Sequence, residues 1–178
     1  IAASAIKALE ELGYANTSLR DIAAKSDMSL GILHYYFEDR SDLIIYCVRV
    51  NKQRFVDGII STLDDTSDRE GVIDVLASAL ATSITQDAMT HRLWYDIRNQ
   101  AMFDKTFRPV VAEIETMLIS IVSRALDCAG SDSPTKVDVQ YALLDGVFRL
   151  LIQDQLGEPS YDFKKSKKVF KSILQKVL

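Results

Sequence analysis

Residues 17–43, TSLRDIAAKSDMSLGILHYYFEDRSDL, decide the fold because they hold three helix starts in a short space. Ser18 is followed three residues later by Asp21, which is the pattern of a capping box at a helix N-terminus. Ser29 and Asp39 precede the next two helical segments, and Ser and Asp are preferred N-cap residues. The stretch therefore predicts short helices over 18–25 and 30–36, and a third helix from residue 40.

Apolar periodicity extends this helical pattern to both sides. Residues 1–12 carry apolar side chains at the spacing of one helix face. The same criterion predicts longer helices over 40–63, 69–86, 88–101, 106–129, 134–156 and 163–177. Gly (7) and Pro (3) are scarce, which favours long helices over a turn-rich β fold. We therefore expect an all-α protein with nine helices.

The composition is that of an ordinary globular chain. Its 178 residues are 48% hydrophobic and 26% charged. No apolar run reaches the roughly 18 residues of a membrane span, so we expect no membrane partner. Cys47 and Cys128 each stand alone in apolar surroundings, which predicts two buried thiols without a disulfide framework, and so a cytoplasmic protein.

Two short helices joined by the tight turn KSDM are typical of a helix-turn-helix, whose second helix enters the DNA major groove. Ile22, Met28 and Leu33 are expected to form the core of this motif, and Tyr36 to pack inward with Phe37. The outward positions of the second helix are then Ser29, Leu30, Ile32, His34 and Tyr35.

The same stretch resembles the signature of TetR-family transcriptional repressors. The shared features are a Thr-rich helix start, an Ile-Ala pair, the core S-x-G-x-L-x-x-x-F, and a long helix capped by an acid or Ser. The resemblance is close over residues 1–47, while the rest of the chain matches in helix number and length. The segment ALLDGVFRLL, residues 142–151, resembles the betaine-responsive branch of the family. A TetR-like architecture implies a helix-turn-helix DNA-binding domain over 1–46 and an effector-binding and dimerisation domain over 47–178.

The resemblance also implies roles for single residues. Phosphate contacts fall to Thr17, Ser18, Tyr35 and Arg40, and base contacts to Ser29, Leu30, Ile32 and His34. Leu30 and Ile32 have no hydrogen-bonding group, so they can contact only thymine methyls. The family's usual turn Gly is replaced by Asp27.

The resemblance implies a one-component repressor that a small-molecule effector releases from a palindromic double-stranded DNA operator. The charge of the head is unusual for this role, because residues 1–50 carry five Lys and Arg against seven Asp and Glu. An all-helical adaptor that binds a protein partner and no DNA is therefore the alternative.

The helix predicted over 88–101 is the candidate effector site. His91, Trp94, Tyr95, Arg98 and Met102 recur at three- and four-residue spacing, so they share one face. Aromatic area with a few polar groups is how small-molecule sites are commonly lined. Plain core packing, with Arg98 reaching water, is the alternative for each residue. Further wall residues are expected at Phe103, Phe107 and Met117.

The helix over 134–156 predicts a homodimer. Its apolar residues occupy nearly the whole circumference, so one side must be covered by its own body and the other by a partner. Gly146 would permit a close helix crossing. The expected interface residues, on the last two helices, are Tyr141, Leu144, Phe148, Leu151, Phe170, Ile173 and Leu174.

The sequence gives little sign of catalysis. Its two histidines, His34 and His91, lack a Glu three residues earlier, so the Glu-x-x-His pattern of helical metal sites is missing. No Gly-rich phosphate loop, nucleophile elbow or Cys/His zinc spacing occurs. We therefore expect no enzyme activity, no cofactor and no metal.

Overall fold

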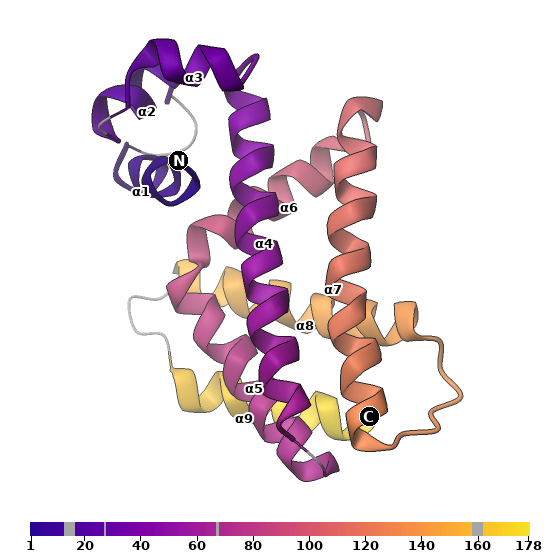
Figure 1. Cartoon of the computed structure of the whole chain (residues 1–178). Helices are drawn as coiled ribbons and strands as arrows, with labels where there is room; N and C mark the ends of the chain where they lie inside the picture. The colour runs from indigo at the N-terminus through magenta and orange to yellow at the C-terminus, as the bar shows by residue number, and fades with distance from the viewer. Residues whose placement is uncertain (13–16, 27, 67, 158–161) are drawn as a thin grey trace. The chain divides into compact units, whose positions relative to one another are not determined.

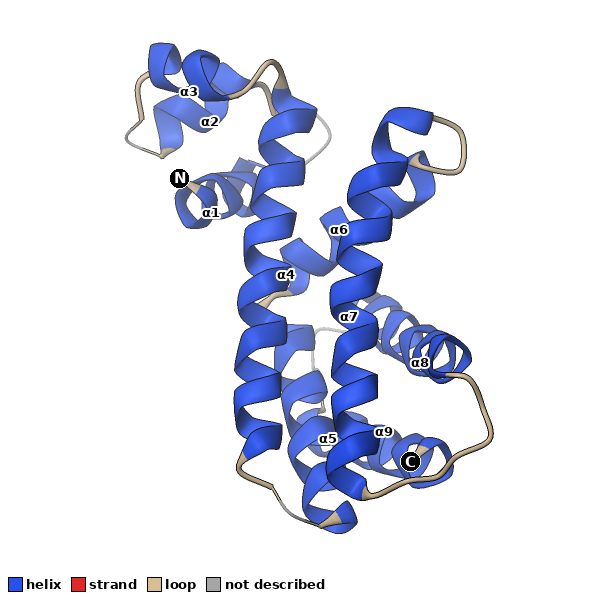
Figure 2. Cartoon of the chain, turned by 45° about the vertical axis from the view of Figure 1, so that its right-hand side comes forward, coloured by secondary structure: helices blue, strands red, loops and turns tan. Residues whose placement is uncertain are grey.

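The computed structural model describes residues 1–12, 17–26, 28–66, 68–157 and 162–178. Asp27, in the predicted turn, lies outside the described residues. Within them the chain forms nine α-helices, one short 3-10 helix and no strand (Figures 1 and 2). The helices are α1 (Ala2–Leu12), α2 (Leu19–Lys25), α3 (Leu30–Tyr36), α4 (Arg40–Asp64), α5 (Arg69–Gln86), α6 (Ala88–Gln100), η1 (Lys105–Phe107), α7 (Arg108–Ala129), α8 (Val137–Gly157) and α9 (Phe163–Val177).

The helices divide into two compact units. The first contains Ile1–Gln53 and Met89–Ile114, and the second contains Arg54–Ala88 and Glu115–Leu178. Helices α4 and α7 each begin in the first unit and end in the second. The sequence predicted a boundary after Tyr46 between a DNA-binding domain and an effector-binding domain. This boundary does not coincide with the division into compact units, and it stays a prediction.

The three helix starts of the opening stretch form as expected. The Asp21 N–H donates to Ser18 Oγ at 3.3 Å and the Ser18 N–H donates to Asp21 Oδ2 at 2.8 Å, which completes the capping box. Ser29 Oγ accepts a hydrogen bond from the Ile32 N–H at 3.1 Å, and Asp39 Oδ1 accepts one from the Asp42 N–H of α4 at 2.9 Å. The bonds from Ser18 lower the pKa of Asp21.

The head is a small helical cluster, α1 to α3 with the start of α4 (Figure 1). Ile22 and Leu33 are fully buried in it, as expected. The expectation for Tyr36 is wrong, because its side chain is 61% exposed and its ring meets Tyr35 edge-on with centroids 4.9 Å apart. The backbone extends after α3, so Phe37 turns into the core while Tyr36 stays on the outer face.

Leu33→Ala is expected to destabilise the head by about 2–5 kcal/mol, because it empties a fully buried site. Denaturant unfolding, with hydrogen exchange of the α2 and α3 amides, measures the effect. Ile32→Ala is the matched control, since the neighbouring Ile32 is half-exposed and its loss should change stability by less than about 0.5 kcal/mol. Equal stability of the two variants would contradict the assignment of Leu33 to the core.

In the second unit α5 packs on α8 and α9 (Figure 1). Phe148 of α8 and Phe170 of α9 lie with ring centroids 5.9 Å apart. The buried Gln140 side chain donates to the Val177 carbonyl at 2.9 Å. Helix α8 begins at Val137, three residues later than expected.

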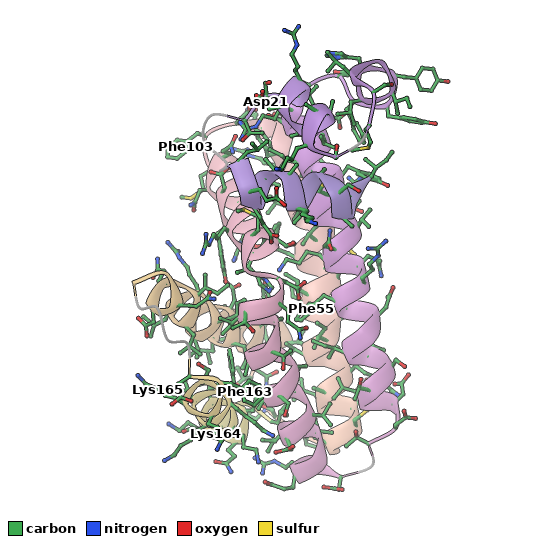
Figure 3. The ribbon with its side chains drawn as sticks, turned by 90° about the vertical axis from the view of Figure 1, so that its left-hand side faces the viewer. Asp21, Phe55, Phe103, Phe163, Lys164 and Lys165 are labelled. Carbon is green, nitrogen blue, oxygen red and sulfur yellow. The ribbon has the colours of Figure 1, made fainter. Side chains whose placement is uncertain are left out.

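Helix α9 is amphipathic, with a basic outer face. Its Lys167 contacts Asp74 of α5 at 3.1 Å, and hydrogen bonds from Lys171 and Lys167 lower the pKa of Asp74. Lys164 and Lys165 are exposed and point away from the ribbon (Figure 3). Among the described helices, none has the length and apolar character needed to cross a membrane.

Candidate DNA interface, effector region and dimer surface

Helix α3 presents a mixed polar and apolar outer face. Ser29, Ile32, His34 and Tyr35 are exposed, and Leu30 is partly exposed. Two large side chains on this face are open to solvent, with Ile32 48% and Tyr35 82% exposed. Large exposed hydrophobic residues that gather on one short helix mark an interaction surface.

Gly31 lies in the middle of this outer face. A Cβ at Gly31 would meet no described atom closer than Ser29 Oγ at 4.0 Å. Glycine inside a helix costs about 0.5–1 kcal/mol relative to alanine. Packing within the described part of the chain does not require this glycine, and its lack of a side chain leaves room for a second body to approach the helix backbone from outside.

The expected phosphate contacts around α3 are placed unevenly. Ser18 is exposed at the start of α2, and Arg40 is half-buried at the start of α4. Thr17 does not fit its expected role, because its side chain is 4% exposed. It stands one residue before the N-cap, where the chain turns its side chain inward.

Several acids of the head are engaged within it. Glu11 forms an ion pair with Lys25 at 2.7 Å, which lowers the pKa of Glu11. Asp21 and Asp39 accept hydrogen bonds from backbone N–H groups at the starts of α2 and α4. These carboxylates are directed to local partners, so the negative charge of the head is partly compensated by fixed backbone dipoles.

The expected effector residues fall into a buried and an exposed group. His91 and Trp94 are 2% and 1% exposed, Phe107 is buried, and Tyr95 and Arg98 are half-buried. The Arg98 guanidinium carbon lies 5.6 Å from the centroid of the Trp94 ring. Part of this site therefore belongs to the interior of the first unit.

Three residues that were expected to line the effector site do not lie with this buried group. Met102 and Phe103 are 72% and 90% exposed, so they do not join the buried residues, and their role in a pocket wall stays a prediction. They lie in the turn after α6, and Phe103 sits at the outer edge of the ribbon (Figure 3). Met117 is half-buried on α7 in the second unit.

Sequence reasoning missed Lys52. Its side chain is 3% exposed, and its Nζ lies 2.6 Å from Nδ1 of His91. A signal for its burial was available, because Val48, Lys52 and Val56 recur at four-residue spacing along the buried stripe of α4. The lysine is the polar member of that stripe.

A separate groove lies in the second unit, between the last part of α4 and α5. It has a volume of about 490 Å³ and a lining of both polar and apolar residues. It contains none of the eight expected effector residues. The lining residues are Arg54, Phe55, Gly58, Ile59, Thr62, Asp74, Val75, Ser78, Ala79, Thr82, Ser83, Gln86 and Asp87.

The dimer residues expected on α8 and α9 lie mainly inside the chain, which corrects that expectation. Five of them are at most 8% exposed, because they pack between the two helices and α5. Tyr141 and Ile173 are half-buried. The five buried residues are Leu144, Phe148, Leu151, Phe170 and Leu174.

The opposite face of α8 carries an exposed apolar stripe. Val139, Leu143 and Leu150 are 48%, 50% and 56% exposed. Together with Gly146 they recur at spacings of four, three and four residues, which places them on one line along the helix. A Cβ at Gly146 would meet no described atom within 4 Å. A second body can therefore approach the α8 backbone closely at Gly146.

Comparisons with known proteins agree with this geometry. Residues 1–47 match the family model "Bacterial regulatory proteins, tetR family". The HTH-type transcriptional regulator PksA of Bacillus subtilis is 22% identical over 153 residues, which are 83% of this chain and 74% of PksA. The fatty acid degradation regulator FadR of Bacillus halodurans has a TM-score of 0.75 at 17% identity, over 97% of this chain and 95% of that one. FadR of Bacillus subtilis in complex with stearoyl-CoA has a TM-score of 0.71 at 17% identity, over 99% and 95%.

The head and the all-helical body define a DNA-binding transcriptional regulator. Residues 1–47 match the TetR-family model, as the opening stretch indicated, and the whole chain has the fold of TetR-family regulators. The expected all-α architecture is confirmed. Its resemblance to the betaine-responsive branch stays a prediction, as do the roles of the individual DNA-contacting residues.

Proposed function

We propose that the chain is a one-component cytoplasmic repressor that binds a palindromic operator as a homodimer and leaves it when an effector binds the body. The observation that carries the operator contact is Gly31, which lies among exposed side chains on α3 and has no packing role within the described chain. DNA that approaches the α3 backbone would explain this glycine. The exposed side chains of Ile32 and Tyr35 lie on the same helix, beside the position where DNA would approach Gly31.

The homodimer is supported by the exposed stripe of α8. Val139, Leu143, Gly146 and Leu150 form a line that the chain itself leaves uncovered. A two-fold axis would bring the same stripe of a second copy against it, and two-fold dimers are the commonest oligomers. Two heads about 34–36 Å apart would then read successive major grooves.

An effector in the body is supported by polar groups buried in the first unit and by the ligand of one structural neighbour. FadR of Bacillus subtilis has been seen with stearoyl-CoA, and its fold is similar over nearly the whole chain. We propose the region around His91, Trp94, Tyr95 and Arg98 as the effector site. The groove between α4 and α5 is the second candidate, since its volume suits a small molecule.

Gly31→Ala separates the DNA-binding role from stability. In the free protein the added methyl meets nothing closer than Ser29 Oγ at 4.0 Å, so the variant should be as stable as the parent or more stable by up to about 1 kcal/mol. The parent protein is first used to select a duplex from a randomised library. The affinity of the variant for this duplex should fall by about tenfold or more, because the methyl prevents a close contact, and a loss of about 1.4 kcal/mol corresponds to tenfold. Thermal unfolding and fluorescence anisotropy measure the two quantities.

Gly58→Ala is the control, because Gly58 lies on α4 of the second unit and also faces open space. It should leave DNA affinity unchanged. If Gly31→Ala bound the selected duplex as tightly as the parent, α3 would not be the element that approaches DNA closely.

A further inference from the structure

Four nitrogen-bearing side chains gather in the first unit. His91, Trp94 and Arg98 stand at positions i, i+3 and i+7 of α6, so they share one face. Lys52 reaches this face from α4, with its Nζ 2.6 Å from Nδ1 of His91. The set therefore joins two helices in the interior of one unit.

The contact between Lys52 and His91 restricts their protonation. At 2.6 Å one of the two nitrogens must accept the proton that the other donates, so the pair shares its protons and cannot be doubly charged without severe repulsion. A positive charge on this pair would lie at a site where both side chains are at most 3% exposed. An anion brought against this charge would interact strongly, because the surrounding dielectric constant is low.

Trp94 provides an independent observation. Its indole N–H is buried, and Nε1 has no hydrogen-bond acceptor among the described residues. Buried donors are nearly always satisfied in native structures, so such a group requires an explanation. A ligand oxygen would supply the acceptor. The indole ring itself offers apolar area beside that oxygen.

We propose that Lys52, Trp94 and Arg98 bind the carboxylate of an organic anion whose remaining body is apolar. The Lys52 ammonium would hold one carboxylate oxygen, and the Trp94 N–H would donate to the other. Arg98, half-buried over the Trp94 ring, would draw the anion in from the more exposed end of the face. This inference rests on the proposed function, in which the body binds an effector, and it names the chemical class of that effector.

Two matched probe pairs test the carboxylate directly. 3-Phenylpropionate and decanoate carry the charge, and their primary amides keep the same apolar body without it. We expect the carboxylates to bind the intact protein at least tenfold more tightly than the amides by isothermal titration calorimetry. The emission of Trp94, the only tryptophan, should change with the same saturation curve.

Three variants assign the residues. Lys52→Met should abolish the tenfold preference for the carboxylate while leaving the affinity for the amide unchanged. Trp94→Phe keeps an aromatic ring without the N–H, and calorimetry should show a three- to tenfold loss for the carboxylate. Lys168→Met removes an exposed lysine of α9 and should change neither affinity.

Equal affinity for the carboxylate and the amide would overturn the inference. An unchanged preference for the carboxylate in Lys52→Met would do the same, and so would the absence of binding of either probe at millimolar concentration. Binding of the selected duplex is measured on the same protein samples. Tight DNA binding without carboxylate binding would remove only this inference, whereas loss of specific DNA binding would remove the proposed function.

Discussion

Leu143→Asp is expected to convert the proposed dimer into a folded monomer and to lower operator affinity by about 100-fold or more. Leu143 is 50% exposed on the outer stripe of α8, so the aspartate costs little within one chain. In a two-fold dimer it would place two carboxylates in an apolar contact. Linking two binding modules raises avidity by about 10²–10⁴ over one module, so the loss of the second head accounts for the lost affinity. Sedimentation, circular dichroism and anisotropy measure association, folding and DNA binding.

Two controls bracket this result. Phe148→Asp changes a residue that is 8% exposed and packs against Phe170, so it should destabilise the chain itself. Ser61→Asp adds the same charge to an exposed position of α4 and should leave the dimer intact. A parent protein that sediments as a monomer at micromolar concentration would refute the dimer and the two-head mechanism together.

Arg40→Ala is expected to weaken binding to every duplex by a similar factor and to lower the salt dependence of binding. Arg40 begins α4, four residues after the end of α3, and the family resemblance gives its guanidinium a phosphate contact. A lost phosphate contact should weaken binding about uniformly and reduce the slope of log affinity against log salt by about 1. Titrations of the selected duplex and a scrambled duplex at several salt concentrations measure both effects.

Arg49→Ala is the matched control, since it removes the same charge from the same helix. Arg49 forms an ion pair with Glu113 at 2.9 Å, which directs its guanidinium to a partner within the chain. It should leave the salt slope nearly unchanged. If Arg40→Ala matched the parent in both affinity and slope, the phosphate role implied by the family resemblance would be wrong.

The helix-turn-helix was predictable because its signals are local. Ser18, Ser29 and Asp39 cap helices through atoms three residues away, so their roles depend on neighbours that the sequence already shows. The longer helices followed from periodicity, and their bounds differ from the expected ones by a few residues. Both kinds of inference need no knowledge of tertiary contacts.

The orientation of apolar residues was harder to predict. On α8, which is apolar on several faces, the sequence does not say which face meets its own chain, and the expected dimer residues Phe148 and Leu151 are the buried ones. Lys52 was missed because lysine is usually exposed, although it lies in register with buried neighbours. Phe103 was expected inside because it is aromatic, but it lies in the turn after α6.

The stoichiometry of the complex with a selected duplex tests the central claim most directly. Analytical ultracentrifugation of the parent protein with this duplex should show two chains per DNA. Footprinting should show two half-sites related by a two-fold axis, with centres about 10–10.5 base pairs apart or a multiple of that spacing. One chain per duplex, or equal affinity for the selected and scrambled duplexes, would contradict the account.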